Sequence, residues 1–384
     1  MNSPKKYIAH LDLDCFFVSV ERIKNTNLVG KPVVVGGSPQ GRGVVASASY
    51  EARKFGIHSA MPMARAVKLC PQLIIVHGRH GEYGRISEKL YKRMCELAPI
   101  VERASIDELN MDFTGCEHLY NNDLPGFMKA MQKVVLDEFH LPCTIALSSN
   151  TAIAKIAANR VKPNGVIFVP HGTEASYLAP FDINVIPGIG KKTEEYLRNK
   201  GFQKVADLQA KTEQQLQHIL GKHGAWIFRA SRGLGSDVIG EDWNAKSISR
   251  EETFAKDIND KKELEQALFL LIEDVCQQLR GHQWLARTIT LKLRYSDFKT
   301  ITRAQSIDPT NDDVVVRKTI TALLYSSYTR KLPIRLIGVR LSNFEEDTQL
   351  DLSLFPSESK KQRILKVVDK IRDKFGDNII HVGG

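Results

Sequence analysis

The sequence contains no hydrophobic run of the length that a transmembrane helix needs, and its first residues lack the apolar segment of a signal peptide. We therefore expect a cytoplasmic protein without a membrane partner. None of the six cysteines belongs to a C-x-x-C pair, so the sequence favours neither a zinc site nor a disulfide framework. It also lacks internal repeats and low-complexity tracts, which argues against a repeat architecture.

Length and charge are the first informative features that are present. The 384 residues suggest about two to four domains, because a single hydrophobic core stops growing well below this length. The formal net charge of +10 makes a polyanionic partner plausible. Charge alone does not distinguish a nucleic acid partner from a solvated basic surface.

Two acidic clusters lie far apart in the sequence, at residues 12–14 and 105–108. The first closes a segment, residues 7–13, whose side chains alternate as in a strand, and this alternation puts Asp12 and Asp14 on one face. Carboxylates are costly to bury without a partner. A shared divalent cation would remove that cost, and oxygen ligands favour Mg²⁺.

Asp12, Asp107 and Glu108 form the sharpest constellation. Two neighbouring strands would bring them around a pair of cations about 3.5–4 Å apart, as two-metal phosphoryl transfer requires. The alternative is that these acids lie at strand ends and pair with arginines such as Arg103.

Strands alternate with helices up to about residue 170, which describes an α/β or α+β catalytic core. From His171 to about Asp237 the composition changes to short helices and glycine turns, and a polar, linker-like stretch follows. Residues 247–344 form a separate α+β unit. Its clearest strand, Thr288–Tyr295, has one face that packs and one basic face with Lys292 and Arg294.

The segment Ser47–Gly56 adds a possible phosphate clamp. Tyr50 and Arg53 are three residues apart, so they share a face if this segment is helical. A guanidinium fork matches phosphate oxygens in two positions, and the neighbouring hydroxyl would add a donor. Lys162, followed by proline, would neutralise further phosphate charge. In isolation, a solvated helix face is the better interpretation of Tyr50 and Arg53, and the Lys162 element is typical of a helix end with ordinary exposed lysines.

These motifs resemble the Y-family translesion DNA polymerases, most closely the bacterial DNA polymerase IV type. The resemblance is carried by segments that occur in the order and at the spacing of that family: Leu11–Glu21, Ser47–Gly56, Ser105–Glu108, and Lys155–Ala157 followed by Lys162–Gly165. It implies an α+β multidomain fold with the right hand of a polymerase (palm, fingers and thumb) and an added little-finger domain.

The resemblance also implies domain limits. The palm is expected to comprise residues 1–15 and 79–170, with the fingers at 16–78 between them. A thumb with a helix-hairpin-helix motif is expected at 171–237, a linker at 238–246 and the little finger at 247–345. The remaining residues, 346–384, are expected to form a tail with a clamp-binding motif.

By resemblance, Asp107 and Glu108 are the catalytic acids, and two Mg²⁺ ions are held by them, by Asp12 and by the backbone carbonyl of Leu13. Strand geometry alone nominates Asp14 as well, but the family pattern does not make it a usual ligand. After Asp107-Glu108 the family usually continues with a small residue and an aromatic, whereas this sequence has Leu109 and Asn110. This departure changes which residues pack beneath the acidic pair.

The same resemblance assigns the incoming deoxynucleoside triphosphate (dNTP) to a set of residues in the first half of the chain: Cys15, Phe16, Phe17, Ser47, Tyr50, Arg53 and Lys162. Backbone amides at Cys15 and Phe16 would contact phosphate oxygens. Phe17 falls at the position of the steric gate, an aromatic ring that leaves no room for a ribose 2′-hydroxyl. From the sequence alone, a core aromatic residue is the favoured interpretation of Phe17.

Residues 186–192 fit the hairpin of a helix-hairpin-helix motif, in which glycines let backbone amides approach a DNA phosphate. A tight turn would have the same pattern. The expected DNA contacts are those of this hairpin and of the basic stretches in the second half: Gly188, Gly190, Lys191, Lys292, Arg294, Arg335 and Arg340. Such contacts position the duplex without reading its bases.

Residues 349–355 match the short motif by which bacterial polymerases bind the sliding clamp. An extended segment would present apolar side chains to a cleft, with a glutamine as the hydrogen-bonding anchor. The motif residues are Gln349, Leu350, Leu352, Leu354 and Phe355. The alternative is an edge strand of the preceding domain.

The function implied is template-directed extension of a primer 3′ end from dNTPs by two-metal nucleotidyl transfer. We expect low fidelity, no proofreading and a role in translesion synthesis and DNA-damage tolerance. The expected partners of this monomer are primer–template DNA, dNTP and the sliding clamp. Two alternatives remain at this point, namely a different two-metal enzyme such as a nucleotidyl cyclase, and a catalytically silent DNA-binding scaffold.

Overall fold

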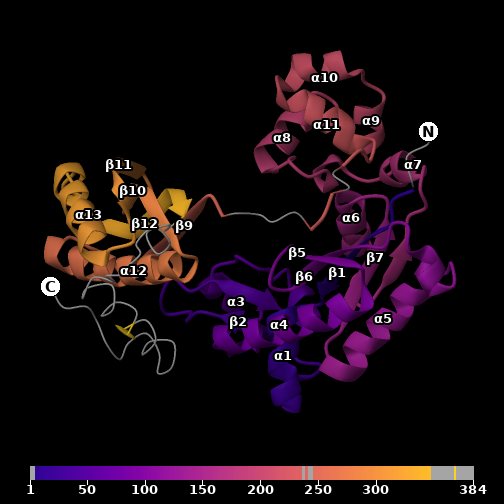
Figure 1. The fold of residues 1–384 in the computed structure, drawn as a ribbon, viewed down its shortest axis with the longest axis horizontal. Coiled ribbons are helices and arrows are strands. Elements are labelled where there is room, and N and C mark those ends of the chain that lie inside the picture. The colour runs from indigo at the N-terminus through magenta and orange to yellow at the C-terminus, as the bar shows by residue number, and fades with distance from the viewer. Residues whose placement is uncertain (1–4, 236–237, 241–244, 347–366, 369–384) are drawn as a thin grey trace, which may run out of the picture. The chain divides into compact units, whose positions relative to one another are not determined.

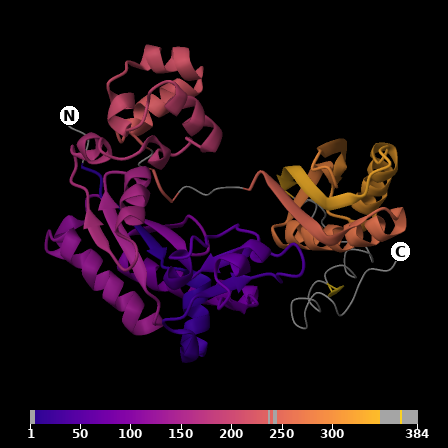
Figure 2. The same ribbon diagram turned by 180° about the vertical axis from the view of Figure 1, so that it is seen from behind.

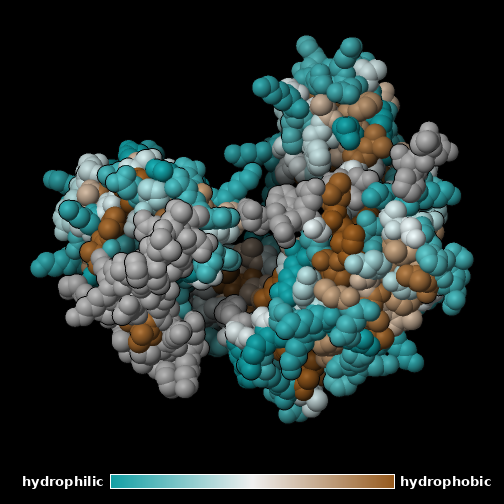
Figure 3. Space-filling view, viewed as in Figure 1, coloured by the Kyte–Doolittle hydropathy of each residue, from teal (hydrophilic) through white to brown (hydrophobic). Residues whose placement is uncertain are grey.

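A computed structural model describes residues 5–235, 238–240, 245–346 and 367–368. The chain forms two compact units, Met1–Asp242 and Trp243–Gly384, which are described separately below. Within the described residues, no helix combines the length and the apolar character that crossing a membrane would demand. The visible face of the first unit carries hydrophilic side chains interspersed with hydrophobic patches, as in ordinary globular proteins (Figure 3).

The first unit is built on a five-stranded sheet with the order β5-β6-β1-β7-β8. Its central strand β1 (Ile8–Leu13) pairs antiparallel with both β6 and β7, and every residue of β1 is buried. The other strands are β5 (Ile100–Arg103), β6 (Glu108–Asp112), β7 (Cys143–Ser148) and β8 (Val166–Phe168). The strand expected at residues 7–13 is thus present, at the centre of the sheet.

Helices cover both faces of this sheet (Figure 1). Odd-numbered residues of β1, such as Leu11, join a core with α4 (His80–Leu97) and α5 (Leu124–Phe139). On the opposite face, α6 (Thr151–Val161) packs against Ala146 of β7. The view from behind shows the strands between the same helices (Figure 2). Even-numbered β1 residues therefore share their face with α6, and this face carries the acidic clusters.

A smaller three-stranded sheet, ordered β3-β2-β4, lies between β1 and α4 in the sequence. Its strands are β2 (Val33–Gly36), β3 (Val45–Ala48) and β4 (Ile74–Val76). Val34 and Val45 pack with Ala52 and Met63. The accompanying helices are α1 (Phe16–Lys24), α2 (Tyr50–Arg53) and α3 (Met63–Leu69). Short 3₁₀ helices occupy Thr26–Leu28, Glu117–Tyr120 and Ile183–Val185.

The remainder of the first unit is helical, as its composition predicts. It contains α7 (Glu174–Leu178), α8 (Lys191–Asn199), α9 (Val205–Gln209), α10 (Glu213–Leu220) and α11 (His223–Ser231). These helices bury aliphatic side chains, including Leu197 and Leu216, in one core with Ile153 of α6. Thr212 caps α10 reciprocally with Gln215, which satisfies backbone amides at the start of that helix.

The second unit is a four-stranded antiparallel sheet, ordered β11-β10-β12-β9, with two helices on one face. Its strands are β9 (Ser247–Ile258), β10 (Trp284–Tyr295), β11 (Thr300–Thr310) and β12 (Ile334–Glu346). The helices are α12 (Lys261–Gly281) and α13 (Asp313–Ser327). Burial alternates along β10 between Ile289 and Tyr295, because the other face of the sheet is left to solvent.

Candidate active site

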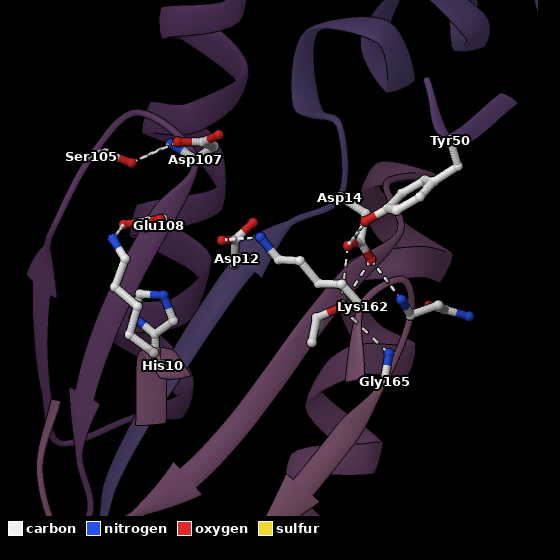
Figure 4. Close-up of polar contacts among 12 residues, drawn as sticks. His10, Asp12, Asp14, Tyr50, Ser105, Asp107, Glu108, Lys162 and Gly165 are labelled. Carbon is white, nitrogen blue, oxygen red and sulfur yellow. Dashed lines mark hydrogen bonds and ion pairs between the residues drawn. The ribbon is translucent and has the colours of Figure 1, made fainter. Parts of the chain in front are cut away.

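The two acidic clusters meet where β1 and β6 lie side by side. In the antiparallel register, Asp12 stands opposite Glu108, and His10 stands opposite Asn110. Paired residues of antiparallel strands point to the same face, so these four side chains gather on the face that α6 covers. Figure 4 shows Asp12 and Glu108 directed into the same region. Ligand atoms of His10, Asp12 and Glu108 lie within 4.8 Å of one another.

Asp12 is buried, and its carboxylate forms an ion pair with the Lys162 ammonium group. Lys162 immediately follows α6, so the end of that helix delivers the cation to β1. Burial raises the pKa of Asp12 to about 6, although Lys162 opposes this shift. The charged form of the buried Asp12 carboxylate is therefore energetically costly without a nearby cation.

Glu108 accepts a hydrogen bond from the Lys155 ammonium group at 2.6 Å, again from α6. Burial opposes ionisation of Glu108, but the hydrogen bond and charge of Lys155 outweigh it and lower the pKa of this carboxyl. The two carboxylates of the site are thus each paired with a lysine.

Asp107 lies beside this pair but is oriented differently. Its carboxylate accepts a hydrogen bond from the Ser105 hydroxyl at 2.6 Å, and its backbone carbonyl accepts from the Leu13 amide at 3.0 Å. The backbone contact joins the end of β1 to the start of β6, while the side chain is held by its own turn. Arg103 pairs with Glu88, so the proposed alternative partner of the acids is engaged elsewhere.

Asp14 follows the end of β1 and has a different set of partners from Asp12. It is 1% exposed and accepts hydrogen bonds from the Tyr50 hydroxyl at 3.0 Å, the Thr144 hydroxyl at 3.1 Å and the Asn164 amide at 2.7 Å. These neutral donors satisfy the buried carboxylate. Asp14 therefore fixes Tyr50 and the turn after Lys162, and Figure 4 shows it apart from Asp12.

The side chains of Tyr50 and Arg53 lie together on α2, as their spacing predicts. The Arg53 guanidinium lies 4.6 Å from the centre of the Tyr50 ring, and its Nε donates to the Ala48 carbonyl at 3.1 Å. Burial and the neighbouring Asp14 raise the pKa of Tyr50, so its hydroxyl stays protonated and can donate. Ser47 is buried in the adjacent strand β3.

Phe17 lies in the first turn of α1, where Cys15 is the N-terminal cap and has a left-handed backbone conformation with φ 41°. Backbone amides in the first turn of a helix, including that of Phe16, have no acceptor within the helix. The Phe17 ring stacks on Tyr83 of α4, with ring centres 4.3 Å apart. The Tyr83 hydroxyl donates to buried Glu21 at 2.8 Å, and burial raises the pKa of Tyr83 to about 12. The ring of Phe17, the candidate steric gate, is therefore held in place by its stacking on the Tyr83 ring, which Glu21 fixes.

His10 is a residue of the site that the sequence motifs did not single out. His10 precedes Asp12 by two residues on the same strand face, and that spacing was the available signal. His10 Nδ1 lies 2.8 Å from Asn110 Oδ1, so the departure from the family pattern at Asn110 is accommodated by a hydrogen bond. Burial lowers the pKa of His10. Leu109 is buried in the core beneath the sheet.

The hairpin expected at residues 186–192 is present between the 3₁₀ turn Ile183–Val185 and α8. Gly188 has φ 92°, which favours glycine, and Gly190 is the N-terminal cap of α8, so Lys191 is its first residue. Nothing in the sequence indicated what supports this loop. Trp226 Nε1 of α11 donates to the Pro187 carbonyl at 3.0 Å. His223 Nε2 lies 3.3 Å from the Gly188 carbonyl.

The basic residues expected in the second unit lie on two different parts of its sheet. Lys292, Arg294 and Arg340 belong to the face opposite the helices. Lys292 donates to Glu251 of β9 at 2.6 Å, so its charge is already partly neutralised. Arg335 instead lies over the ring of Phe298, in the turn between β10 and β11, at 4.5 Å. Residues 349–355 of the expected clamp motif lie outside the described residues.

Three parts of the chain match models of known protein families. Residues 11–159 match the impB/mucB/samB family, and residues 245–354 match the C-terminal domain of the same family. Residues 184–235 match the thumb domain of DNA polymerase iota. The hairpin and helices α8 to α11 lie within the last of these ranges.

Individual relatives cover nearly the whole chain. DNA polymerase IV of Dehalococcoides mccartyi (strain CBDB1) is 38% identical over 379 residues, which span 98% of this chain and 96% of the relative. DNA polymerase IV of Listeria monocytogenes serotype 4b (strain F2365) is 36% identical over 346 residues, or 90% and 97% of the two chains.

Among solved structures, a Y-family DNA polymerase chimera, Dbh-Dpo4(243-245)-Dbh, aligns with a TM-score of 0.78 and 26% identity, covering 88% of this chain and 99% of that one. This similarity confirms the expected α+β fold with a polymerase right hand and a little-finger domain. The similarity supports neither of the two alternatives, the nucleotidyl cyclase and the catalytically silent DNA-binding scaffold. The chain therefore belongs to the Y-family of DNA polymerases, among the proteins of DNA polymerase IV type, and is a DNA-directed DNA polymerase.

Proposed function

We propose that this polymerase extends primers by two-metal nucleotidyl transfer, with low fidelity and without proofreading, in translesion synthesis and DNA-damage tolerance. The observation that carries the mechanism is the pair of facing carboxylates, Asp12 on β1 and Glu108 on β6, each with a lysine ammonium group as its partner. Enzymes that transfer phosphoryl groups with the help of metal ions need carboxylates that converge on one point and are held there by rigid elements.

The residues present fit divalent cations. Asp12 and Glu108 offer oxygen ligands, Asp107 adds a third carboxylate at the start of β6, and the Leu13 carbonyl follows Asp12 directly. The raised pKa of Asp12, about 6, is the mark of a buried carboxylate that gains from a nearby positive charge. Hard oxygen ligands of this kind suit Mg²⁺, which keeps positions open for substrate phosphates.

When bound, Mg²⁺ would lower the pKa of the primer 3′-hydroxyl and offset charge on the in-line transition state. The residues of the chain would bind and orient the dNTP. Lys162, released from Asp12, would bind a phosphate of the dNTP, and Arg53 would hold the triphosphate in two positions. Ser47 would add a hydroxyl donor, and Tyr50 would do so once its single hydroxyl hydrogen turns from Asp14 to the phosphate. Backbone amides at Cys15 and Phe16 would hold phosphate oxygens, and pyrophosphate would leave.

Phe17 would select the sugar. Its ring, fixed against Tyr83, would occupy the space that a ribose 2′-hydroxyl needs, so deoxynucleotides would bind in preference. The ring cannot swing aside without giving up its stacking on Tyr83.

The domain limits follow from these roles. We assign the palm to residues 1–15 and 79–170, the fingers to 16–78, the thumb to 171–237, the linker to 238–246 and the little finger to 247–345. In the thumb, Gly188, Gly190 and Lys191 would present backbone amides to a DNA phosphate. In the little finger, Lys292, Arg294, Arg335 and Arg340 would follow the duplex backbone. The protein would act as a monomer in the cytoplasm.

The tail, residues 346–384, would recruit the sliding clamp through residues 349–355. Deleting these seven residues should remove stimulation of synthesis by the clamp, because the deletion leaves the catalytic and DNA-binding residues in place. Primer extension with and without added clamp measures this effect. If extension by the free enzyme collapsed as well, the segment would be structural.

The metal assignment is tested by Asp107→Ala. Primer extension on a primed template should fall by at least about three orders of magnitude, because one of the acids that hold the metal ions is lost. Salt-sensitive DNA binding should persist, since basic residues elsewhere provide it. Asp112→Ala is the matched control, because Asp112 ends β6, the strand that Asp107 precedes, and contacts Lys6 and Thr114 instead. Equal extension by the Asp107 variant and the parent would defeat the assignment.

A further inference from the structure

The active-site face of β1 carries a histidine that the proposed mechanism does not use. His10 is 1% exposed, and its Nδ1 lies 2.8 Å from Asn110 Oδ1 on β6. Because an amide oxygen has no hydrogen to give, Nδ1 must be the donor in this contact. The hydrogen bond therefore fixes the tautomer in which Nε2 carries a lone pair.

His10 Nε2 is buried and has no hydrogen-bond partner among the described residues. A buried acceptor without a partner is costly, and such groups in native proteins call for an explanation. The side chain lies on the same strand face as the acids, and one of its two ring nitrogens is within 4.8 Å of carboxylate oxygens of Asp12 and Glu108. Figure 4 shows His10 beside Glu108, on the side away from Asp107. Because Asn110 occupies Nδ1, Nε2 is the ring atom left to join the two carboxylates in one donor set.

We propose that His10 Nε2 is a nitrogen ligand for a metal ion held by Asp12 and Glu108, and that it gives this position a preference for Mn²⁺-class transition metal ions over Mg²⁺. The inference rests on the proposed metal-dependent function and concerns the choice of metal. Magnesium prefers carboxylate, carbonyl and water oxygens, whereas imidazole nitrogen suits first-row transition metals. Lys162 and Lys155, which now pair with the two carboxylates, would have to release them when a metal ion binds there.

Asn110 is the positioning residue of this arrangement. Metal-binding histidines commonly donate their second ring N–H to a carbonyl or carboxylate, which orients the ring and fixes the tautomer. The Asn110 side chain fills that role from the neighbouring strand. The departure from the family pattern at this position is thereby tied to the metal preference.

The decisive measurement is pulsed electron paramagnetic resonance of the full-length protein loaded with Mn²⁺. The parent should show hyperfine coupling from an imidazole ¹⁴N, and His10→Gln should lose it. His118→Gln is the matched control, because His118 is exposed and lies in a 3₁₀ helix away from the acids, and it should keep the coupling. Absence of coupling in the parent, or its persistence in His10→Gln, overturns the inference. His10→Asn serves if His10→Gln does not fold.

Competition titrations of Mn²⁺ against Mg²⁺ give a second readout. The ratio of the two dissociation constants should shift toward Mg²⁺ by about 10-fold or more in His10→Gln, and in the same direction in Asn110→Leu. An unchanged ratio in both variants contradicts the proposal. If the parent lacks nitrogen coupling while Mg²⁺ still supports extension that depends on Asp107, the proposed function stands and this inference alone fails.

Discussion

The sheets of the two units differ in where their charged residues lie and in the sign of that charge. The central strand of the first sheet, β1, is buried along its whole length and still contains His10, Asp12 and, just beyond its end, Asp14. In the second sheet, β10 alternates between apolar residues that face helices and charged residues that face solvent, such as Lys292 and Arg294. The first sheet concentrates costly negative charge, and the second distributes positive charge where hydration stabilises it.

The physical consequence is a division of labour. Buried carboxylates need cations at fixed places, and Lys155 of α6 and Lys162, which follows this helix, supply them. Exposed basic residues need no fixed partner, and a polyanion with a regular backbone satisfies them in many registers. Substitutions in the first sheet should therefore change chemistry, and those in the second should change affinity.

The largest expected effect comes from Asp12→Asn. Extension should fall by at least about three orders of magnitude, because the amide removes a charged ligand from β1. The same substitution should stabilise the metal-free protein at pH 8. The folded-state pKa of Asp12 is about 6 against an ordinary value of 3.8, so the buried carboxyl favours folding below pH 4 and this contribution is lost as the pH rises through 6.

About two pKa units correspond to a stability change of about 3 kcal/mol, an upper bound because Lys162 loses its partner in the variant. Thermal unfolding with a chelator at pH 4 and pH 8 measures the effect. The melting temperature of Asp12→Asn should exceed that of the parent by more at pH 8 than at pH 4. A difference independent of pH would mean that Asp12 carries no burial cost, and the contrast between the sheets would weaken.

An intermediate effect is expected at Phe17, beside the first sheet. Phe17→Ala should reduce discrimination against ribonucleotides by about 10- to 100-fold, because the space beside the sugar opens. Use of deoxynucleotides should change little. Single-nucleotide incorporation with paired ribo- and deoxynucleotides gives the ratio, and unchanged sugar selectivity would refute the gate. Phe139→Ala, in α5, is a control aromatic truncation on the other side of the same core.

The smallest effect is expected in the second sheet. Replacing Arg294 and Arg340 together by alanine should raise the dissociation constant for DNA by about 10-fold at low salt. The slope of affinity against salt concentration should also become shallower, by about 0.9 for each phosphate that the variant no longer neutralises. Fluorescence anisotropy over a range of salt concentrations measures both quantities.

Two further variants test this prediction more sharply. Arg317→Ala is the matched control, because Arg317 belongs to α13 on the helix-covered side and packs over Phe269. Glu251→Gln should act in the opposite direction and tighten binding, since it releases Lys292 from its ion pair. If the double variant had a lower maximal extension rate but kept its DNA affinity, the division of labour between the sheets would be wrong.

Periodicity and turn chemistry were sufficient for the elements near the site. Alternation along residues 7–13 located β1, and the spacing of Tyr50 and Arg53 placed both side chains together on α2. The hairpin glycines were also apparent, since Gly188 needs a positive φ. Their supports were not apparent, because Trp226 and His223 lie in a helix distant in sequence and reach the loop through their side chains.

The sequence by itself determined which residue types the protein has for chemistry, namely carboxylates on short strands, a tyrosine and an arginine at helical spacing, and basic residues on an exposed strand. Those features are local, and local spacing fixes which side chains share a face. Only the tertiary structure decided that Asp12 faces Glu108, that Asp14 holds Tyr50, and that His10 meets Asn110. The first and third of these pairings depend on strand register between segments about 100 residues apart, and the second joins the end of β1 to a helix 36 residues further along the chain. No local pattern encodes such contacts.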